Sequence, residues 1–453
     1  MNKDQQAKVE PPQLPPELLD WLTRPVTRFL RIQAAAGGVL LLFTIAALVL
    51  SNSPWANPFL AFWETPVGIQ AGSLELSRSL RGWINDALMT LFFFHVALEL
   101  KRELVLGELR NPRMAALSIA AALGGMLVPV ILYWVLQSGQ PGQSGWGTVM
   151  ATDTAFVIGC LALLGRRISH SLRIFMLSLA IVDDLGAVLV VAIGYGNHIN
   201  WEPLILVVVG IAIVRGMTQL GVRSTAIYFL MGALIWLAVD ASGIHATVTG
   251  VILGLMTPTV RWVSDERMHA ILGRVVAYPP GDHWSGDTED RKALRMAEAA
   301  ARETLSPVER LVMALHPWVA FAILPLFAFA NAGVPITFDD LENSVTVAVF
   351  VGFAIGKPIG VFGFSWLAVR TGIAMRPADL NWRLLAAGSL LAGIGFTMAL
   401  FIANLAFTTE LINAAKLGIL SASVFSAVVG VMLLRHGLRV EIKKIPPEMS
   451  SGF

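Results

Sequence analysis

We identify four charged residues inside long apolar stretches of this sequence. Asp183 and Asp184 are adjacent in Ile-Val-Asp-Asp-Leu-Gly, whereas Asp153 lies in Ala-Thr-Asp-Thr-Ala. Lys357 lies in Ile-Gly-Lys-Pro-Ile-Gly. At the centre of a membrane-spanning helix each charge costs about 2.5–3.5 kcal/mol, so the four cost on the order of 10 kcal/mol together. Charges this unfavourable are retained where they pair, line water or carry function.

Carboxylates in this setting suit a cation and a proton. Na⁺ prefers hard oxygen ligands, and a buried carboxylate can hold either a proton or a cation. Competition of two ions for one anionic site is the simplest way to couple their movements. Because successive helical residues point about 100° apart, Asp183 and Asp184 cannot face one partner alike. The alternative is a structural salt bridge that holds helices together, and for Lys357 both interpretations stay open.

Composition predicts the elements that carry these charges. Of 453 residues, 55% are hydrophobic and 14% are charged, against about 25% charged in soluble domains. The apolar residues form blocks of roughly 17–25, the length of a helix that crosses about 30 Å of hydrocarbon. The sequence therefore predicts an all-α integral membrane protein with about twelve spans, namely 32–51, 83–100, 114–136, 148–165, 174–193, 203–218, 224–239, 245–260, 316–330, 344–368, 384–405 and 411–434.

Basic residues mark one side of these spans. The basic loops carry Arg166, Arg167, Arg173, Arg370, Arg376, Arg383, Arg435, Arg439, Lys443 and Lys444. The loops on the other side that contain no Lys or Arg are 137–147, 194–203, 240–244, 331–343 and 406–410. Only Arg78 and Arg81, in the loop 52–82, break this pattern. Because cytoplasmic loops are enriched in basic residues, we expect both termini to lie in the cytoplasm. The chain itself is expected in the cell inner membrane.

Segments outside the bilayer flank a single transmembrane domain. Residues 1–31 are expected to form a cytoplasmic segment, which is proline-rich and charged and so differs from a cleavable signal peptide. The transmembrane domain spans 32–434, and 435–453 form a cytoplasmic tail. Residues 261–310 form a mixed-charge cytoplasmic loop, interpreted as a solvated linker. The single cysteine, Cys160, excludes an internal disulfide, and no basic, aromatic-interleaved surface suggests nucleic acid.

An external hairpin is predicted within the loop 52–82. Residues 65–80 alternate apolar and polar side chains around Gly72, a pattern typical of two strands joined by a turn. A lone hairpin is marginally stable in water. Its open edge can pair with an identical edge or can pack on its own protomer, and both arrangements stay open.

Two of the charges are predicted near the middle of the membrane. Counting about 1.5 Å per helical residue, Asp183 lies roughly 15 Å in from Arg173 on the cytoplasmic side. On the same count, Lys357 lies roughly 18 Å in from the outer end of its span. Both residues therefore fall near the midplane.

Two spans are predicted to be interrupted at the same depth. Asp153 reaches the midplane only if 149–154 is partly extended, and the flanking threonines suit an unwound stretch whose backbone groups need partners. The run Gly-Ile-Gly-Phe-Thr at 393–397 interrupts a later span, where we expect glycine to supply conformational freedom. The interruptions fall in the second helix of two three-helix groups, 114–193 and 344–434, which enter the membrane from opposite sides. This pattern is typical of an inverted repeat with a midplane ion site.

Eight motifs stand in order along residues 20–435. They are Trp-Ile-Asn-Asp-Ala-Leu-Met (83–89), Glu-Leu-Lys-Arg-Glu-Leu (99–104), Ala-Thr-Asp (151–153), Ala-Ile-Val-Asp-Asp-Leu-Gly-Ala (180–187), His-Ala-Thr (245–247), Leu-Pro-Leu-Phe-Ala-Phe-Ala-Asn-Ala-Gly (324–333), Gly-Lys-Pro (356–358) and Gly-Ile-Gly-Phe-Thr-Met (393–398). Together they resemble the NhaA sodium/proton antiporters, which are themselves a standard example of the inverted-repeat construction. The resemblance implies electrogenic, sodium-extruding exchange of Na⁺ or Li⁺ for H⁺, activated at alkaline pH, with neither enzymatic activity nor a cofactor.

The resemblance also implies roles for single residues. Asp184 is the principal carboxylate shared by cation and proton, and Asp183 is its proton-carrying companion and the partner of Lys357. Thr152 and Asp153 compensate helix-end dipoles and can ligate the ion. The interrupted helix depends on Gly393, Gly395 and Thr397.

A pH-sensing cluster is implied at the cytoplasmic funnel. Its members are Glu99, Arg102, Glu103, His316 and, as a modulator, His245. For the first three, a solvated helix end is the alternative. The chain departs from the family here, because Val312 and Met313 are apolar where well-known members carry Glu and His. His95, in Phe-Phe-Phe-His-Val-Ala, can titrate near neutral pH or serve as a hydrogen-bonded structural histidine.

The resemblance further implies a homodimer joined through the hairpin 65–80, within membrane lipid. Other functions fit less well. A sodium-coupled organic-solute symporter of related fold would need a roomy polar cavity, which paired aspartates and a lysine argue against. An intramembrane aspartyl protease would carry its aspartates in Tyr-Asp and Gly-x-Gly-Asp, which no predicted span contains. A scaffold without transport would not retain four midplane charges.

Overall fold

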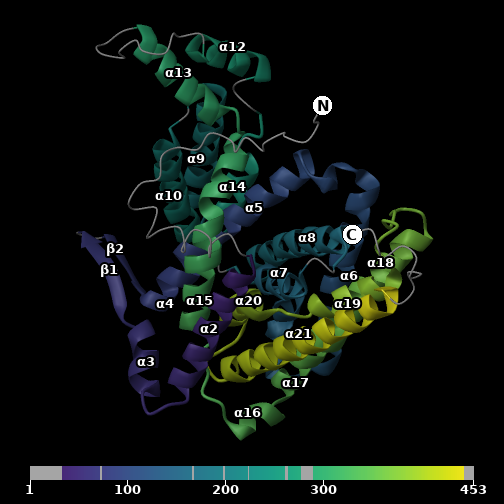
Figure 1. Cartoon of the computed structure of the whole chain (residues 1–453). Coiled ribbons are helices and arrows are strands. Elements are labelled where there is room, and N and C mark those ends of the chain that lie inside the picture. The colour runs from purple at the N-terminus through teal and green to yellow at the C-terminus, as the bar shows by residue number, and fades with distance from the viewer. Residues whose placement is uncertain are drawn as a thin grey trace.

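The computed structural model describes residues 33–71, 74–165, 168–196, 199–222, 224–260, 264–276 and 289–442. Within these ranges the chain is mostly helical and contains one two-stranded sheet (Figure 1). The prediction of a helical membrane protein is confirmed at this level. The predicted segment 1–31, the tail from 443 onwards, and Arg166 and Arg167 lie outside the described residues.

Among the described residues, seven helical segments are long and apolar enough to cross a membrane. They are Leu80–Val105, Pro112–Leu136 (α6), His170–Gly194 (α8), Trp201–Gln219 (α9), Pro307–Asn331, Ser344–Arg370 and Ile412–His436, the last within α21 (Ile412–Ile442). Their length and composition are those of membrane spans. The chain is therefore a multi-pass membrane protein.

Three of these segments contain one π-helical turn. Leu80–Val105 comprises α4 (Leu80–Trp83), the turn η1 (Ile84–Leu88) and α5 (Met89–Val105). Pro307–Asn331 comprises α14 (Pro307–Trp318), the turn η5 (Val319–Ile323) and α15 (Leu324–Asn331). Ser344–Arg370 comprises α17 (Ser344–Val351), the turn η6 (Gly352–Gly356) and α18 (Lys357–Arg370). Such turns are frequent at functional sites, and η6 ends directly before Lys357.

Three further pairs of helices are apolar together but bent at a short break. They are α2 (Gln33–Ser51) with α3 (Ala56–Trp63), η3 (Pro141–Met150, a 3₁₀ helix) with α7 (Thr154–Leu163), and α19 (Trp382–Leu391) with α20 (Phe396–Ala406). Counting each pair once gives up to ten spans. The shorter α10 (Thr225–Ala241) and α11 (Val248–Met256) cover the remaining two predicted spans. The predicted span 245–260 is thus only nine residues of helix.

The shorter elements lie outside these segments. The predicted hairpin is present as β1 (Pro66–Ala71) paired antiparallel with β2 (Leu74–Ser79), although Gly72 of its predicted turn lies outside the described residues. The predicted loop 261–310 contains α12 (Asp265–Val276) and α13 (Glu289–Glu303), which stand together at one end of the molecule (Figure 1). The remaining elements are η2 (Glu108–Arg110) and α16 (Phe338–Glu342), of which α16 lies at the opposite end.

Glycines let α6 and α18 approach backbone to backbone. A Cβ atom added at Gly124 would overlap the carbonyl oxygen of Gly360, and one added at Gly360 would overlap that of Gly124. The next residue, Gly125, faces Val361 and the aliphatic part of Lys357. Small residues permit such close contact between helices in membranes. The pair therefore carries Lys357 into the core at a fixed position.

Candidate functional site

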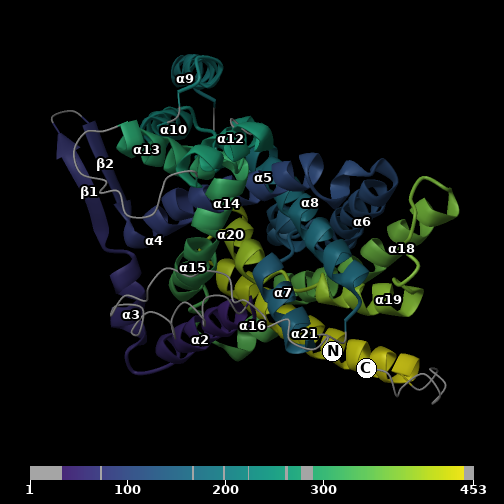
Figure 2. The same cartoon turned by 45° about the horizontal axis from the view of Figure 1, so that its top comes forward.

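The two interrupted helices meet at their breaks, in a region called here the crossing (residues 151–153 and 392–395). Both stretches are non-helical, and the bends amount to 48° between η3 and α7 and 46° between α19 and α20. The amide of Asp153 donates to the carbonyl of Ile394 over 2.7 Å. The structure thus contains the interruptions expected near 149–154 and 393–397. α7, α8 and α20 lie together in the middle of the molecule in both views (Figures 1 and 2).

The Asp153 carboxylate joins the N-termini of the two short helices. Its Oδ1 accepts the amide of Phe156 in α7 over 3.0 Å. Its Oδ2 accepts the amide of Thr397 in α20 over 3.0 Å and the Thr397 hydroxyl over 2.5 Å. Helix N-termini carry about half a positive charge each, so one carboxylate here faces two of them. Asp153 and Thr397 are 1% exposed, which strengthens this interaction.

Asp183 pairs with Lys357 beside the crossing. The Lys357 Nζ lies 2.6 Å from Asp183 Oδ2, and both residues are 1% exposed. The same ammonium donates to the carbonyl of Met150. The Thr152 hydroxyl lies 2.5 Å from Asp183 Oδ2 and 3.0 Å from the carbonyl of Ala392. The unwound backbone therefore contributes directly to the surroundings of the ion pair.

Asp184 points to a different partner, as adjacent helical positions require. Its Oδ2 accepts the hydroxyl of Thr154 over 3.0 Å. Within the described part of the chain, the Oδ1 atoms of Asp183 and Asp184 are buried without a hydrogen bond. Unpaired buried carboxylate oxygens are costly and are the ligand type that Na⁺ prefers. The arrangement can hold a cation or a proton.

The glycines at the crossing are required for space. The φ angle of Gly395 is −86°, and the glycines with positive φ all lie elsewhere in the described residues. A Cβ at Gly393 would lie 2.6 Å from the carbonyl oxygen of Phe353, and one at Gly395 would overlap the ring of Phe353. The expectation that glycine supplies conformational freedom here is wrong. The physical reason is close approach between η6 and the crossing.

A pocket of about 820 Å³ opens at one end of α5, α6 and α8. Its lining includes Glu103, Arg110, His170, Ile174, Leu177 and Ser178. Ser178 precedes Asp184 by about 9 Å along α8. Between them, Ile181 belongs to a small buried apolar cluster with Leu100, Leu109 and Ala115. Along α8, this apolar layer thus lies between the pocket residue Ser178 and the carboxylate of Asp184.

The predicted pH-sensing residues fall into two places. His95 Nε2 lies 3.4 Å from Glu99 Oε1, and the rings of His95 and His316 are 5.8 Å apart. Arg102 pairs with Glu103 over 3.1 Å on the same helix end. The structure therefore brings these residues together where α5 meets α14.

His245 lies in the second place. It interacts electrostatically with Asp86 and Asp240, and its ring lies 6.3 Å from that of Phe401. Asp86 precedes Glu99 by about 20 Å along the helix. The structure does not bring His245 together with the other predicted sensor residues.

Some polar residues were missed by reasoning from the sequence. The contact of Thr154 with Asp184 was not predicted, although Thr154 lies in the motif Ala-Thr-Asp-Thr-Ala beside the interruption, which could have identified it. The count of four charges inside spans omitted Lys416, which is 4% exposed within the predicted span 411–434. It also omitted Asp86, Glu99 and Arg215, in the predicted spans 83–100 and 203–218. The amides of Asn85, Asn331 and Asn404 form a partly buried network at 2.8–3.4 Å, which no local pattern indicates.

The described residues contain seven to ten segments long and apolar enough to cross a membrane, with ionisable residues buried among them. These features define a multi-pass membrane protein with charge in its core. The family model described as Na+/H+ antiporter 1 matches residues 27–434. The chain belongs to this family.

Relatives resemble the chain over nearly its whole length. The Na(+)/H(+) antiporter NhaA 2 of Acidiphilium cryptum (strain JF-5) is 64% identical over 96% of this chain and 97% of its own. The NhaA antiporter of Rhizobium meliloti (strain 1021) is 62% identical over 93% of this chain and 96% of its own. The Na(+)/H(+) antiporter NhaA 2 of Vibrio vulnificus (strain CMCP6) is 57% identical over 96% of this chain and 97% of its own. The resemblance inferred from the motifs is confirmed.

Proposed function

We propose that this protein exchanges Na⁺ or Li⁺ for protons across the cell inner membrane and extrudes the metal cation. The main structural support is the pair of adjacent buried aspartates, Asp183 and Asp184. Among the described residues, each has one carboxylate oxygen that forms no hydrogen bond. Family membership and the names of the relatives support sodium and protons as the ions.

Asp184 is the shared binding residue in this proposal. Thr154 occupies one of its carboxylate oxygens, which leaves the other for a cation or a proton. At low pH protons occupy the carboxylate and exclude Na⁺, so exchange rises with pH. Asp183 takes up a second proton when its bond to Lys357 breaks. Membership of the antiporter family supports electrogenic exchange.

Asp153 acts by charge compensation. Both of its oxygens are already engaged by the N-termini of α7 and α20. Hydrogen bonds to a charged group contribute about 1.5–3 kcal/mol each, so these bonds stabilise the Asp153 charge at the crossing. This supports Asp153 as the residue that holds the crossing together, with Thr397 as its partner. Thr152 instead faces Asp183 and the ion.

The pocket lined by Glu103 and Ser178 is the cytoplasmic access route, closed by the apolar layer around Ile181. The bent pairs η3/α7 and α19/α20 have nearly equal bends and corresponding places in the groups 114–193 and 344–434. This supports an inverted repeat within twelve spans, with both termini cytoplasmic. α10 and α11 are then the two shortest crossings.

His95, Glu99 and His316 form the pH-responding cluster in this proposal. Their contacts at the pocket end of α5 support the assignment. Val312 packs with Leu98 and Val308 in a buried apolar cluster, so the position taken by Glu in other members contributes no charge here. Two copies of the chain associate through the hairpin 65–80.

Replacing Asp184 by Asn tests the proposal. Wild-type protein in proteoliposomes is expected to dissipate a pH gradient when Na⁺ or Li⁺ is added. Folded Asp184→Asn should not, because an amide neither releases a proton nor carries the charge that holds Na⁺. Asp339→Asn, at an exposed position of α16, is the matched control and should behave as wild type. Substantial cation-dependent dissipation by Asp184→Asn would reject the assignment.

A further inference from the structure

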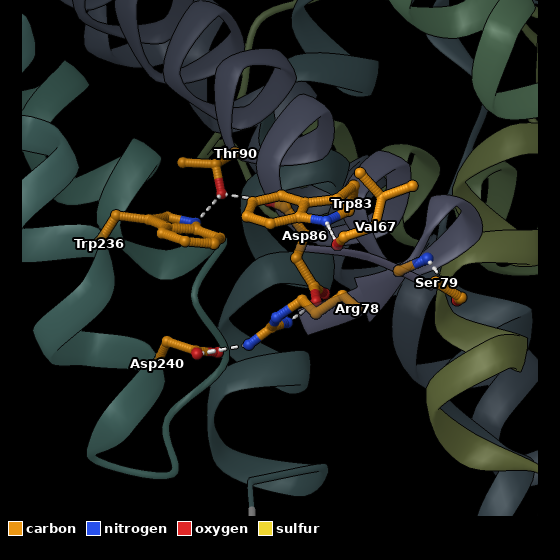
Figure 3. A network of polar contacts seen from close by, with 9 residues as sticks. Val67, Arg78, Ser79, Trp83, Asp86, Thr90, Trp236 and Asp240 are labelled. Carbon is orange, nitrogen blue, oxygen red and sulfur yellow. Dashed lines mark hydrogen bonds and ion pairs between the residues drawn. The ribbon is translucent and has the colours of Figure 1, made fainter. Parts of the chain in front are cut away.

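Arg78 connects three parts of the molecule. It lies in β2 near the base of the external hairpin, and its guanidinium forms ion pairs with Asp86 in η1 and with Asp240 in α10 (Figure 3). Asp86 follows Arg78 by eight residues, whereas Asp240 is 162 residues away. One side chain therefore bridges the hairpin, the span that follows it and a distant helix.

Two tryptophans complete this contact, called here the hairpin clamp (Arg78, Trp83, Asp86, Trp236 and Asp240). The Trp236 ring lies 5.7 Å from the Arg78 guanidinium carbon and stacks on Trp83, with the ring centroids 6.2 Å apart. The Trp83 indole donates to the carbonyl of Val67 in β1 over 2.7 Å. The Trp236 indole donates to Thr90 over 3.0 Å. Both strands of the hairpin are thus attached to helices.

The charges of the clamp are partly buried. The exposed fractions of the side chains are 25% for Arg78, 17% for Asp86 and 27% for Asp240. Burial works against the charge of Arg78, but its hydrogen bonds to the aspartates and their charges outweigh burial and raise the pKa of Arg78. Such pairs are screened less than exposed ones. The planar guanidinium can bond two carboxylates at once, which a lysine ammonium cannot do in the same geometry.

The clamp lies where the hairpin, η1 and α10 meet. α9, α10 and α11 share a small apolar cluster of their own, centred on Val207, Val214, Ile235 and Val239. The hairpin projects from the side of the helical body in both views (Figures 1 and 2). Its sheet has two strands, so both outer edges lack a strand partner within the described residues. Unpaired edges are templates for pairing with another chain.

We propose that Arg78 is a positioning residue for assembly, which fixes the hairpin against η1 and α10 so that its open edge meets a second copy of this chain in one orientation. A free hairpin would sample many orientations, and pairing would have to restrict them at an entropic cost. Because the clamp already fixes the orientation of the hairpin in the protomer, pairing with a second copy does not incur this entropic cost. The inference rests on the proposed dimer and adds the residue that organises it.

The test compares Arg78→Met, Arg78→Lys and wild type in detergent. Light scattering over a range of concentrations gives the dimer Kd, and hydrogen exchange gives the protection of the β1 and β2 amides. Arg78→Met should raise the dimer Kd at least about tenfold and should speed amide exchange in the hairpin. The dimer Kd and the hairpin exchange rate of Arg78→Lys should lie between those of wild type and Arg78→Met, since lysine keeps the charge but is expected to pair with only one of the two aspartates. Arg376→Met is the matched control, because Arg376 also lies against a tryptophan, Trp382, and should leave both readouts unchanged.

Other outcomes separate this inference from the proposed function. Arg78→Met with wild-type dimer Kd and wild-type hairpin exchange overturns the inference alone. If Arg78→Met fails to fold, Asp240→Asn removes one of the two partners and should weaken the dimer in the same direction; no weakening overturns the inference. A monomeric wild type rejects both the clamp's role in assembly and the proposed dimer. Antiport, measured on the same samples in proteoliposomes, tests the transport proposal independently and should be unchanged in Arg78→Met.

Discussion

Replacing Lys357 by Met is expected to destabilise the folded protein by about 3–5 kcal/mol, because it removes one partner of a buried ion pair. The ammonium lies 2.6 Å from Asp183, and both residues are 1% exposed. Met has a similar length and volume, so cavity formation adds little. Without Lys357, the buried Asp183 carboxylate keeps only the Thr152 hydroxyl at 2.5 Å. The large cost therefore comes from an uncompensated charge.

A double-mutant cycle isolates the free energy of interaction between Lys357 and Asp183. Asp183→Asn leaves the opposite charge unpaired and should also destabilise, whereas the variant carrying both changes has no unpaired charge. The double variant should lose less than the sum of the single losses, with a coupling free energy between about 1 and 3 kcal/mol. The measurement is unfolding by dodecyl sulfate in mixed micelles, followed by the fluorescence of the 13 tryptophans. Losses that add within about 0.5 kcal/mol would refute the reasoning, since the two groups would then not stabilise each other.

Three further predictions follow from the site and the hairpin. Thr397→Val should cost about 1.5–3 kcal/mol in the same unfolding assay, because it removes the hydroxyl bond to the Asp153 carboxylate; an unchanged stability would contradict this. His95→Ala should shift the pH profile of antiport by less than about one pH unit, equivalent to about 1.4 kcal/mol, and should keep the rise with pH, because proton competition at Asp184 remains; a flat profile would show that the rise depends on His95 and not on competition at Asp184. Deleting 65–77 should give a monomer by light scattering that still exchanges ions, because each protomer contains a complete site; a dimeric deletion variant would reject the hairpin interface.

Local features of the sequence predicted most of the architecture. Helix positions follow from the lengths of apolar blocks, which are local properties, and charges in such blocks stand out because burial is costly. The resemblance to the NhaA antiporters implied that Lys357 is the partner of Asp183, and the structure has the two 2.6 Å apart. The breaks near Asp153 and Gly393 were visible because polar residues and glycines interrupt apolar runs.

Contacts between distant segments were harder to predict. His95 and His316 are 221 residues apart in the sequence and have adjacent rings, which only the packing of α5 on α14 determines. His245 lies with Asp86 and Asp240 for the same kind of reason. The π-helical turns leave no mark in the hydropathy. The sequence pattern predicted that Gly393 matters for the interruption. The structure shows that glycine is needed there because Phe353 of a neighbouring helical segment approaches closely, and not because of the backbone conformation of Gly393.

The contact between Gly124 and Gly360 has a consequence for how this sequence can vary. Each glycine faces the backbone of the other, so neither partner has a side chain that could shrink to accommodate a larger residue opposite. A change at either position therefore has no single-residue compensation. Both glycines are expected to be inherited together wherever α6 and α18 keep this distance. A homologue that has lost one of them should also have lost the path along Gly125 by which Lys357 reaches Asp183.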